Sequence, residues 1–189
     1  MKLQTLLLRG TIIMKTTGLA RGISNYWITT ILLIVVKLCF HFLTNTNYEL
    51  HRDEMLYFNM ADHPDFGYVS VPPLTGFLAY IIKVLFGYSV FGIRLIPAVL
   101  GTTSVLIISK IVKDLGGSIL ALIIASSAFL LSPGFLIFDT LFTPNAPEQF
   151  LWLLITYLIF QMIGSNNPKQ WILIGIFIGI AFRHLRIQQ

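Results

Sequence analysis

The chain has 189 residues, of which 56% are hydrophobic and 11% are charged, and its mean hydropathy is +0.80. Because a soluble domain carries roughly 25% charged residues, this composition excludes a soluble globular protein and indicates an integral membrane protein. The formal net charge is +5, but the basic residues are scattered and form no run, which argues against nucleic-acid binding. The one cysteine, Cys39, lies inside an apolar run, so the chain has no disulfide framework.

The first apolar run covers residues 26–43 and follows a basic N-terminal tail without acids. The run is long enough for a tilted membrane span, and no small-residue cleavage site follows it, so we predict an uncleaved first helix rather than a signal peptide. Lys37 interrupts the run near one end. We favour the interpretation that its ammonium group snorkels to the nearer interface; the alternative is a buried functional lysine.

Later apolar runs predict four more spans, at residues 95–112, 119–138, 150–163 and 171–182. Pro97 is expected in the first turn of its span, and Pro133 followed by Gly134 is expected to kink the next one. Residues 74–87 are apolar but too short to cross a bilayer comfortably, so we predict a helix at the membrane surface. The predicted fold is therefore all-α, one membrane domain over residues 1–189 with about five transmembrane helices and a juxtamembrane helix in a long outer loop, residues 44–94.

The distribution of charge predicts which loops lie outside the cell. The N-terminal tail is expected in the cytoplasm because it is rich in lysine and arginine, which places residues 44–94 and 139–149 outside. The same topology places residues 113–118 and 164–170 inside. Every acidic residue except Asp114 then falls on the outer side, so we expect any chemistry there.

The polar segment 48–74 holds most of the acidic residues, and functional residues concentrate in such loops. Asp53 and Glu54 are candidates for chemistry, but they also suit a short helix over residues 55–60, with Asp53 as its N-cap. Tyr57 follows Asp53 by one turn and would face the same side, either contacting a substrate or lying in an interfacial aromatic belt.

Other polar residues give weaker signals. His51 and His63 flank the same segment without a third ligand at a suitable spacing, so we predict no metal site there. Asp139 and Glu148 in the second outer loop complete an acidic site, bind a divalent ion or are solvated loop acids, and we favour the last interpretation.

Three motifs occur in a fixed order: Arg52-Asp53-Glu54 with Tyr57, then Val71-Pro72-Pro73-Leu74, then Phe86-Gly87 before Arg94-Leu95-Ile96-Pro97. Together with the later segment FTPNAPEQFLW, this order resembles glycosyltransferase family 39, over about residues 25–182. The family includes protein O-mannosyltransferases and the bacterial aminoarabinose transferases of lipid A. Leu56 stands where the aminoarabinose transferases have a basic residue, which argues against that branch.

The resemblance implies transfer of a sugar from a polyprenyl-phosphate-linked donor to a protein, lipid or glycan acceptor on the outer face of a membrane, expected to be the bacterial inner membrane. Asp53 matches the family's catalytic acidic position, with Glu54 beside it, and the reaction is expected to invert the anomeric carbon. The substrate-binding candidates are Arg52, Tyr57, Lys83 and Arg94, three of which are cations that could neutralise the lipid phosphate. No cofactor is certain, and a divalent cation is left open.

The sequence contains fewer spans than the family, and after residue 182 it departs from the family's usual continuation. We therefore expect a truncated product or a fragment, whose activity is in doubt. The alternative function is a non-catalytic membrane protein or the remnant of a degraded gene. A transporter fragment is less favoured, because only Lys37 and Lys110 lie in the spans, near their ends, and no repeat is visible.

Overall fold

The computed structural model describes residues 25–45, 47, 49–65, 68, 71–165 and 169–185. The described residues contain helices and no strand, which confirms the all-α fold. The N-terminal helix, Asn25–Thr44, is followed by α2 (Arg52–Asp62), α3 (Pro73–Phe86), α4 (Val90–Asp114), α5 (Ile119–Leu131), α6 (Pro133–Phe138), α7 (Asn145–Ser165) and α8 (Lys169–Leu185). The basic N-terminal tail, residues 166–168 of the predicted inner loop and the chain after residue 185 lie outside the described residues.

Three of the described helices are long and apolar enough to cross a membrane: Asn25–Thr44, Val90–Asp114 and Asn145–Ile163. The third predicted span is not continuous, because Ser132 ends α5 and starts α6. Pro133 has no N–H to continue the hydrogen-bond ladder and disfavours a helical conformation at the residue before it. The fifth predicted span corresponds to α8, whose 17 residues rise about 25 Å, somewhat less than the hydrocarbon core.

Helix α4 begins earlier than the apolar pattern predicts. The Ser89 side chain accepts a hydrogen bond from the Gly92 N–H at 3.3 Å and caps the helix, so α4 starts at Val90. Pro97 therefore lies inside the helix rather than in its first turn, which corrects the prediction from sequence. The chain reverses just before this cap at Gly87, whose φ of 66° favours glycine.

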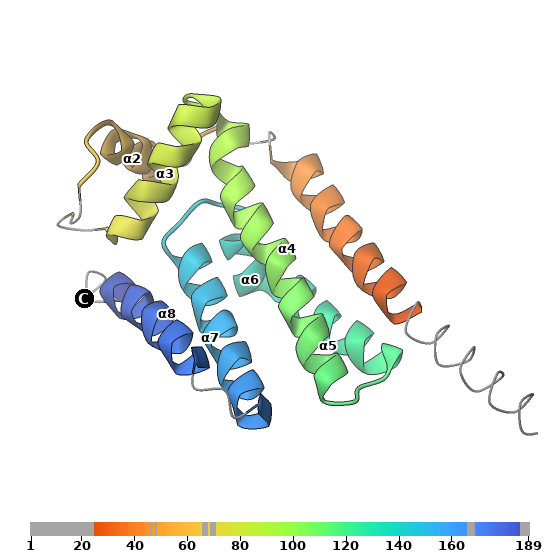
Figure 1. Ribbon diagram of the computed structural model, residues 1–189. Helices are drawn as coiled ribbons and strands as arrows, with labels where there is room; N and C mark the ends of the chain where they lie inside the picture. The colour runs from red at the N-terminus through yellow and green to blue at the C-terminus, as the bar shows by residue number, and fades with distance from the viewer. Residues whose placement is uncertain are drawn as a thin grey trace, which may run out of the picture.

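Helices α2 and α3 pack side by side at the end of the molecule where the N-terminal helix ends and α4 begins (Figure 1). The short helix predicted over residues 55–60 is longer and includes Arg52 and Asp53. Helix α3 covers nearly the residues of the helix predicted over 74–87, whose place at the membrane surface stays a prediction, and it begins with Pro73 at its first position, where the missing N–H costs least.

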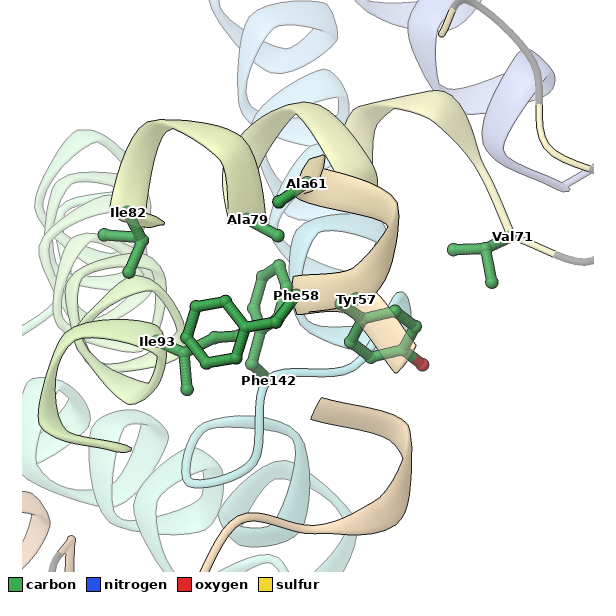
Figure 2. Packing of buried hydrophobic residues seen from close by; sticks show 8 residues of the cluster. All are labelled: Tyr57, Phe58, Ala61, Val71, Ala79, Ile82, Ile93 and Phe142. Carbon is green, nitrogen blue, oxygen red and sulfur yellow. The ribbon is translucent and has the colours of Figure 1, made fainter. Parts of the chain in front are cut away.

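A cluster of buried apolar side chains joins α2 to its neighbours (Figure 2). It consists of Tyr57, Phe58, Ala61, Val71, Ala79, Ile82, Ile93 and Phe142. These residues come from α2, the chain before α3, α3 itself, α4 and the connection between α6 and α7. Full burial of one large apolar side chain stabilises a fold by about 1.5–3 kcal/mol, so the cluster holds α2 firmly in one orientation.

Helix α4 is the central element, in contact with α3, α5 and α7, while α8 packs on α7 (Figure 1). The N-terminal helix runs antiparallel to α4. At one end the Tyr26 hydroxyl donates to the Ser109 carbonyl at 2.7 Å, and at the other Arg94 donates to the Asn45 carbonyl at 2.5 Å. The chain therefore leaves the N-terminal helix at one end of the bundle and leaves α4 at the opposite end.

Candidate functional site

Helix α2 begins with a capping box centred on His51. The Asp53 N–H donates to His51 Nδ1 at 3.3 Å, and the His51 N–H donates to Glu54 Oε2 at 2.9 Å. The prediction that Asp53 is the N-cap is therefore wrong. A capping box needs an acceptor side chain three residues after the cap, and Glu54 supplies it only when the cap is His51.

The Glu54 carboxylate lies at the centre of a buried ion pair with Arg94. Arg94 Nε and Nη2 donate to Glu54 Oε1 and Oε2 at 3.1 and 3.0 Å, and the two side chains are 3% and 1% exposed. The Phe142 N–H donates to Glu54 Oε1 at 3.2 Å. Together with the His51 N–H, these donors satisfy both carboxylate oxygens, as a buried charge requires.

The guanidinium of Arg94 also fixes the chain that leads into α2. Its Nη1 donates to the Asn45 carbonyl at 2.5 Å, and its Nη2 donates to the Glu49 carbonyl at 2.7 Å. One arginine on α4 therefore binds the end of the N-terminal helix, the connecting segment and α2. The planar fork of five donors makes arginine suited to such a junction.

Asp53 lies next to this junction but faces solvent. Its side chain is 40% exposed, with Oδ1 at 3.6 Å from Arg52 Nε and Oδ2 at 3.8 Å from His51 Nδ1. Arg52 is 93% exposed. The structure thus separates the two neighbouring acids, because Glu54 is enclosed and fully hydrogen-bonded while Asp53 is accessible on a helix turn fixed by its cap.

Tyr57 packs into the core rather than against lipid. It is 5% exposed, and its ring meets the Phe142 ring edge to face at 5.5 Å (Figure 2). Burial raises the pKa of Tyr57 to about 12, and the negative charges of Asp53 and Glu54 add to the rise. Its contact with Phe142 joins α2 to the connection before α7, so the interpretation as part of an interfacial belt is wrong.

Lys83, another sequence-predicted substrate contact, lies at the opposite end of α2 from Asp53. Its ammonium group pairs with Asp62 Oδ1, to which the Tyr88 hydroxyl also donates at 2.5 Å. Lys83 also lies over the Tyr88 ring, 5.2 Å from its centre. Because Asp53 and Asp62 are separated by about 14 Å along the helix, the structure does not bring Lys83 to the Asp53 end.

Lys37 does not snorkel to the interface. Its Nζ lies 2.7 Å from Asp139 Oδ2, and the two side chains are 5% and 4% exposed. Asp139 is therefore not a solvated loop acid either. Gly101 makes the pair possible, because a Cβ at that position of α4 would lie 2.6 Å from the Asp139 carboxylate. Sequence periodicity could not show that an acid distant in the chain lies beside this lysine.

A cavity of about 600 Å³ opens beside the Arg94 junction. This volume falls in the range of small-molecule sites. The end of the N-terminal helix, the chain entering α2, Arg94 and the start of the α6–α7 connection line it: His41, Thr44, Asn45, Glu49, Leu50, His51, Arg52, Arg94, Thr140 and Leu141. Sequence analysis missed His41 and Asn45, whose only signal is two polar residues one turn apart at the end of an apolar run.

A second, more open cavity of about 890 Å³ lies among α4, α5, α6 and α7. Aromatic side chains line much of it, and Glu148 contributes from the first turn of α7. Glu148 and Asp139 therefore have different surroundings and do not form the joint acidic site considered from the sequence. Among the residues that the structure describes, no group of three or more His, Cys, Asp or Glu side chains could hold a metal ion.

A family model described as dolichyl-phosphate-mannose-protein mannosyltransferase matches residues 70–184, more than half of the chain. The match includes Lys83 and Arg94 and begins after α2. No curated protein and no solved structure matches the chain.

Proposed function

This chain belongs to the dolichyl-phosphate-mannose-protein mannosyltransferase family, and we propose that it transfers a sugar to an acceptor at the cavity beside α2. Family membership implies a glycosyltransferase in a membrane with a polyprenyl-phosphate-linked sugar as donor. We further propose which carboxylate is catalytic, which cation binds the phosphate and on which side of the membrane transfer takes place.

The proposed side is the outer face of the bacterial inner membrane, with the N-terminus in the cytoplasm. Two segments assigned to the outside from their charges, residues 44–94 and 139–149, meet through the hydrogen bond from the Phe142 N–H to Glu54. Their meeting at one site supports a common side. The excess of basic residues before the first span gives the direction.

Asp53 is the proposed catalytic carboxylate, and its exposure on a helix turn held by a capping box is the observation that carries this assignment. The carboxylate accepts the proton of an acceptor hydroxyl while that oxygen attacks the anomeric carbon. The bond between the anomeric carbon and the phosphate oxygen breaks on the opposite face, so the configuration inverts. The polyprenyl phosphate leaves as an anion and needs no proton from an acid.

Arg52 is the proposed cation for the departing phosphate. Of the three cations considered from the sequence, Lys83 is paired with Asp62 and Arg94 with Glu54, whereas Arg52 lines the cavity, is 93% exposed and has a solvent-exposed contact with Asp53 at 3.6 Å. A guanidinium can donate two parallel hydrogen bonds to phosphate oxygens. Asp53 is not among the residues that line the cavity, but its Oδ1 lies 3.6 Å from Arg52 Nε, so the proposed base is the immediate neighbour of the proposed phosphate cation.

Glu54, Arg94 and Tyr57 have a positioning role in this proposal. Both oxygens of Glu54 already accept hydrogen bonds, and Tyr57 is enclosed in the core, so neither is free to exchange a proton with a substrate. They hold the turn that carries Arg52 and Asp53. A catalytic group must be fixed closely to be effective.

The test is Asp53→Asn, which keeps the shape of the side chain and removes its basicity. Transfer from polyprenyl-phosphate-linked sugars, beginning with mannose, is measured in membranes containing the full chain. We expect the rate to fall roughly 100- to 10,000-fold, the contribution of a positioned general base. Asp65→Asn, an acid in the same loop, is the matched control and should leave the rate unchanged.

Unchanged transfer by Asp53→Asn would remove the catalytic assignment. A wild-type protein that transfers sugar from none of these donors would favour the non-catalytic alternative.

A further inference from the structure

Two polar residues at the end of the N-terminal helix have side chains that no part of the described fold satisfies. His41 is 2% exposed and Asn45 is 4% exposed. His41 lies beside the Asp139 backbone, yet neither of its ring nitrogens and neither amide atom of Asn45 has a hydrogen-bond partner in good geometry among the described residues. Buried polar atoms are nearly always paired, so four such atoms on adjacent turns need an explanation.

Both residues line the cavity beside α2, whose lining combines charged and uncharged groups. Arg52 contributes an accessible positive charge, which suits the phosphate of a lipid-linked sugar, whereas Arg94 already donates to Glu54 and to two backbone carbonyls. His41 and Asn45, with the hydroxyls of Thr44 and Thr140, contribute uncharged donors and acceptors. An ionised phosphate accepts hydrogen bonds and donates none, whereas a sugar hydroxyl both donates and accepts.

The backbone under these two side chains is fixed. The Asn45 N–H donates to the His41 carbonyl at 2.8 Å, and the Asn45 carbonyl accepts from Arg94 Nη1 at 2.5 Å. Lys37, one turn before His41, is held by Asp139. The amide and the imidazole are therefore presented from an anchored helix end, as a site that discriminates between ligands requires.

We propose that His41 and Asn45 bind hydroxyl groups of the donor's sugar ring and so determine which sugar is transferred, an inference that rests on the proposed function. Arg52 receives the phosphate, and the uncharged polar groups of the lining receive the ring. Because both side chains are shielded from bulk water, a ring that lacks the matching hydroxyl leaves them unpaired. A site built in this way rejects such an analogue strongly.

The experiment compares two ligands of the purified full-length chain in detergent: polyprenyl-phosphate mannose and sugar-free polyprenyl phosphate. Asn45→Leu and His41→Leu remove the hydrogen-bonding atoms at similar volume. Each should weaken binding of the sugar-bearing lipid roughly 10- to 100-fold and leave binding of the sugar-free lipid unchanged. Arg52→Gln should weaken binding of both lipids alike, and Thr29→Val, about three turns before His41 on the same helix, should change neither.

Equal weakening of both lipids by Asn45→Leu would show a structural role and overturn the inference, and so would no weakening at all. A wild-type protein that binds the two lipids equally would also overturn it. If Asn45→Leu does not fold, Asn45→Ser provides the same comparison with a smaller polar side chain. Because these are binding measurements, they are independent of the Asp53→Asn transfer assay, and either proposal can fail alone.

Discussion

The two ends of α2 are each attached to a neighbouring helix by an ion pair, but the pairs differ in their surroundings. At the first turn, Glu54 and Arg94 are 1% and 3% exposed, and both make further hydrogen bonds to backbone groups. At the last turn, Asp62 and Lys83 are 33% and 27% exposed, and the additional partner is the Tyr88 hydroxyl. The difference lies in how much of the surrounding chain depends on each pair.

The buried pair of Glu54 and Arg94 joins several segments of the chain, whereas the partly exposed pair of Asp62 and Lys83 joins two helices. Removing one partner of a buried pair leaves an unpaired charge without water and is strongly destabilising. An ion pair that is open to solvent is screened by water, so removing one partner lowers the stability of the fold only a little. The end of α2 that carries Asp53 is therefore expected to be the rigid end.

The largest effect should come from breaking the buried junction. Arg94→Leu leaves the Glu54 carboxylate buried without its cation and removes the donors to the Asn45 and Glu49 carbonyls. We expect the free energy of unfolding in detergent to fall by about 3–5 kcal/mol. The double variant Glu54→Leu with Arg94→Leu should recover part of this loss, and a double variant less stable than Arg94→Leu would contradict the account.

A somewhat smaller effect is expected for the pair between Lys37 and Asp139, which has fewer additional hydrogen bonds. Asp139→Leu should lower the free energy of unfolding by about 3 kcal/mol, because the Lys37 ammonium remains buried. Lys37→Met combined with Asp139→Leu serves as the matched control and should be more stable than Asp139→Leu alone. If Asp139→Leu were as stable as the wild type, the Lys37 ammonium group would have to reach the membrane interface, as the sequence alone suggested.

The smallest effect is expected at the last turn of α2. Asp62→Asn should change the free energy of unfolding by less than about 1 kcal/mol, because Lys83 and Asp62 are partly solvated. The change should shrink further as salt is added. A loss as large as that of Arg94→Leu would mean that the two ends of α2 are equally important, and the comparison would fail.

The sequence was sufficient for the features that depend on local pattern. Apolar runs gave the first, second and fourth spans, and the length of residues 74–87 gave α3. The break after Ser132 could be anticipated only as a kink, because a proline indicates an interruption but not how far the helix beyond it turns.

The site was less predictable because its contacts join residues far apart in the chain. Asp53 and Arg52 could be named from a motif, but nothing local to Glu54 indicates that its partner is Arg94, or that Lys37 pairs with Asp139. The cap is another example: a histidine is an unusual acceptor at this position, and a rule based on preferred cap residues selects Asp53 instead of His51.

The absence of a side chain at Gly101 also sets the register of α4. A one-residue screw motion of the helix, a rise of about 1.5 Å with a rotation of about 100°, would bring the bulkier Leu100 or Thr102 toward the place where the Asp139 carboxylate now lies. Helix α4 is thereby locked against this screw motion past the connection that begins at Asp139. It acts as a fixed frame on one side of the cavity, and the Arg94 junction holds the first turn of α2 on the other side, so the cavity is expected to keep its shape.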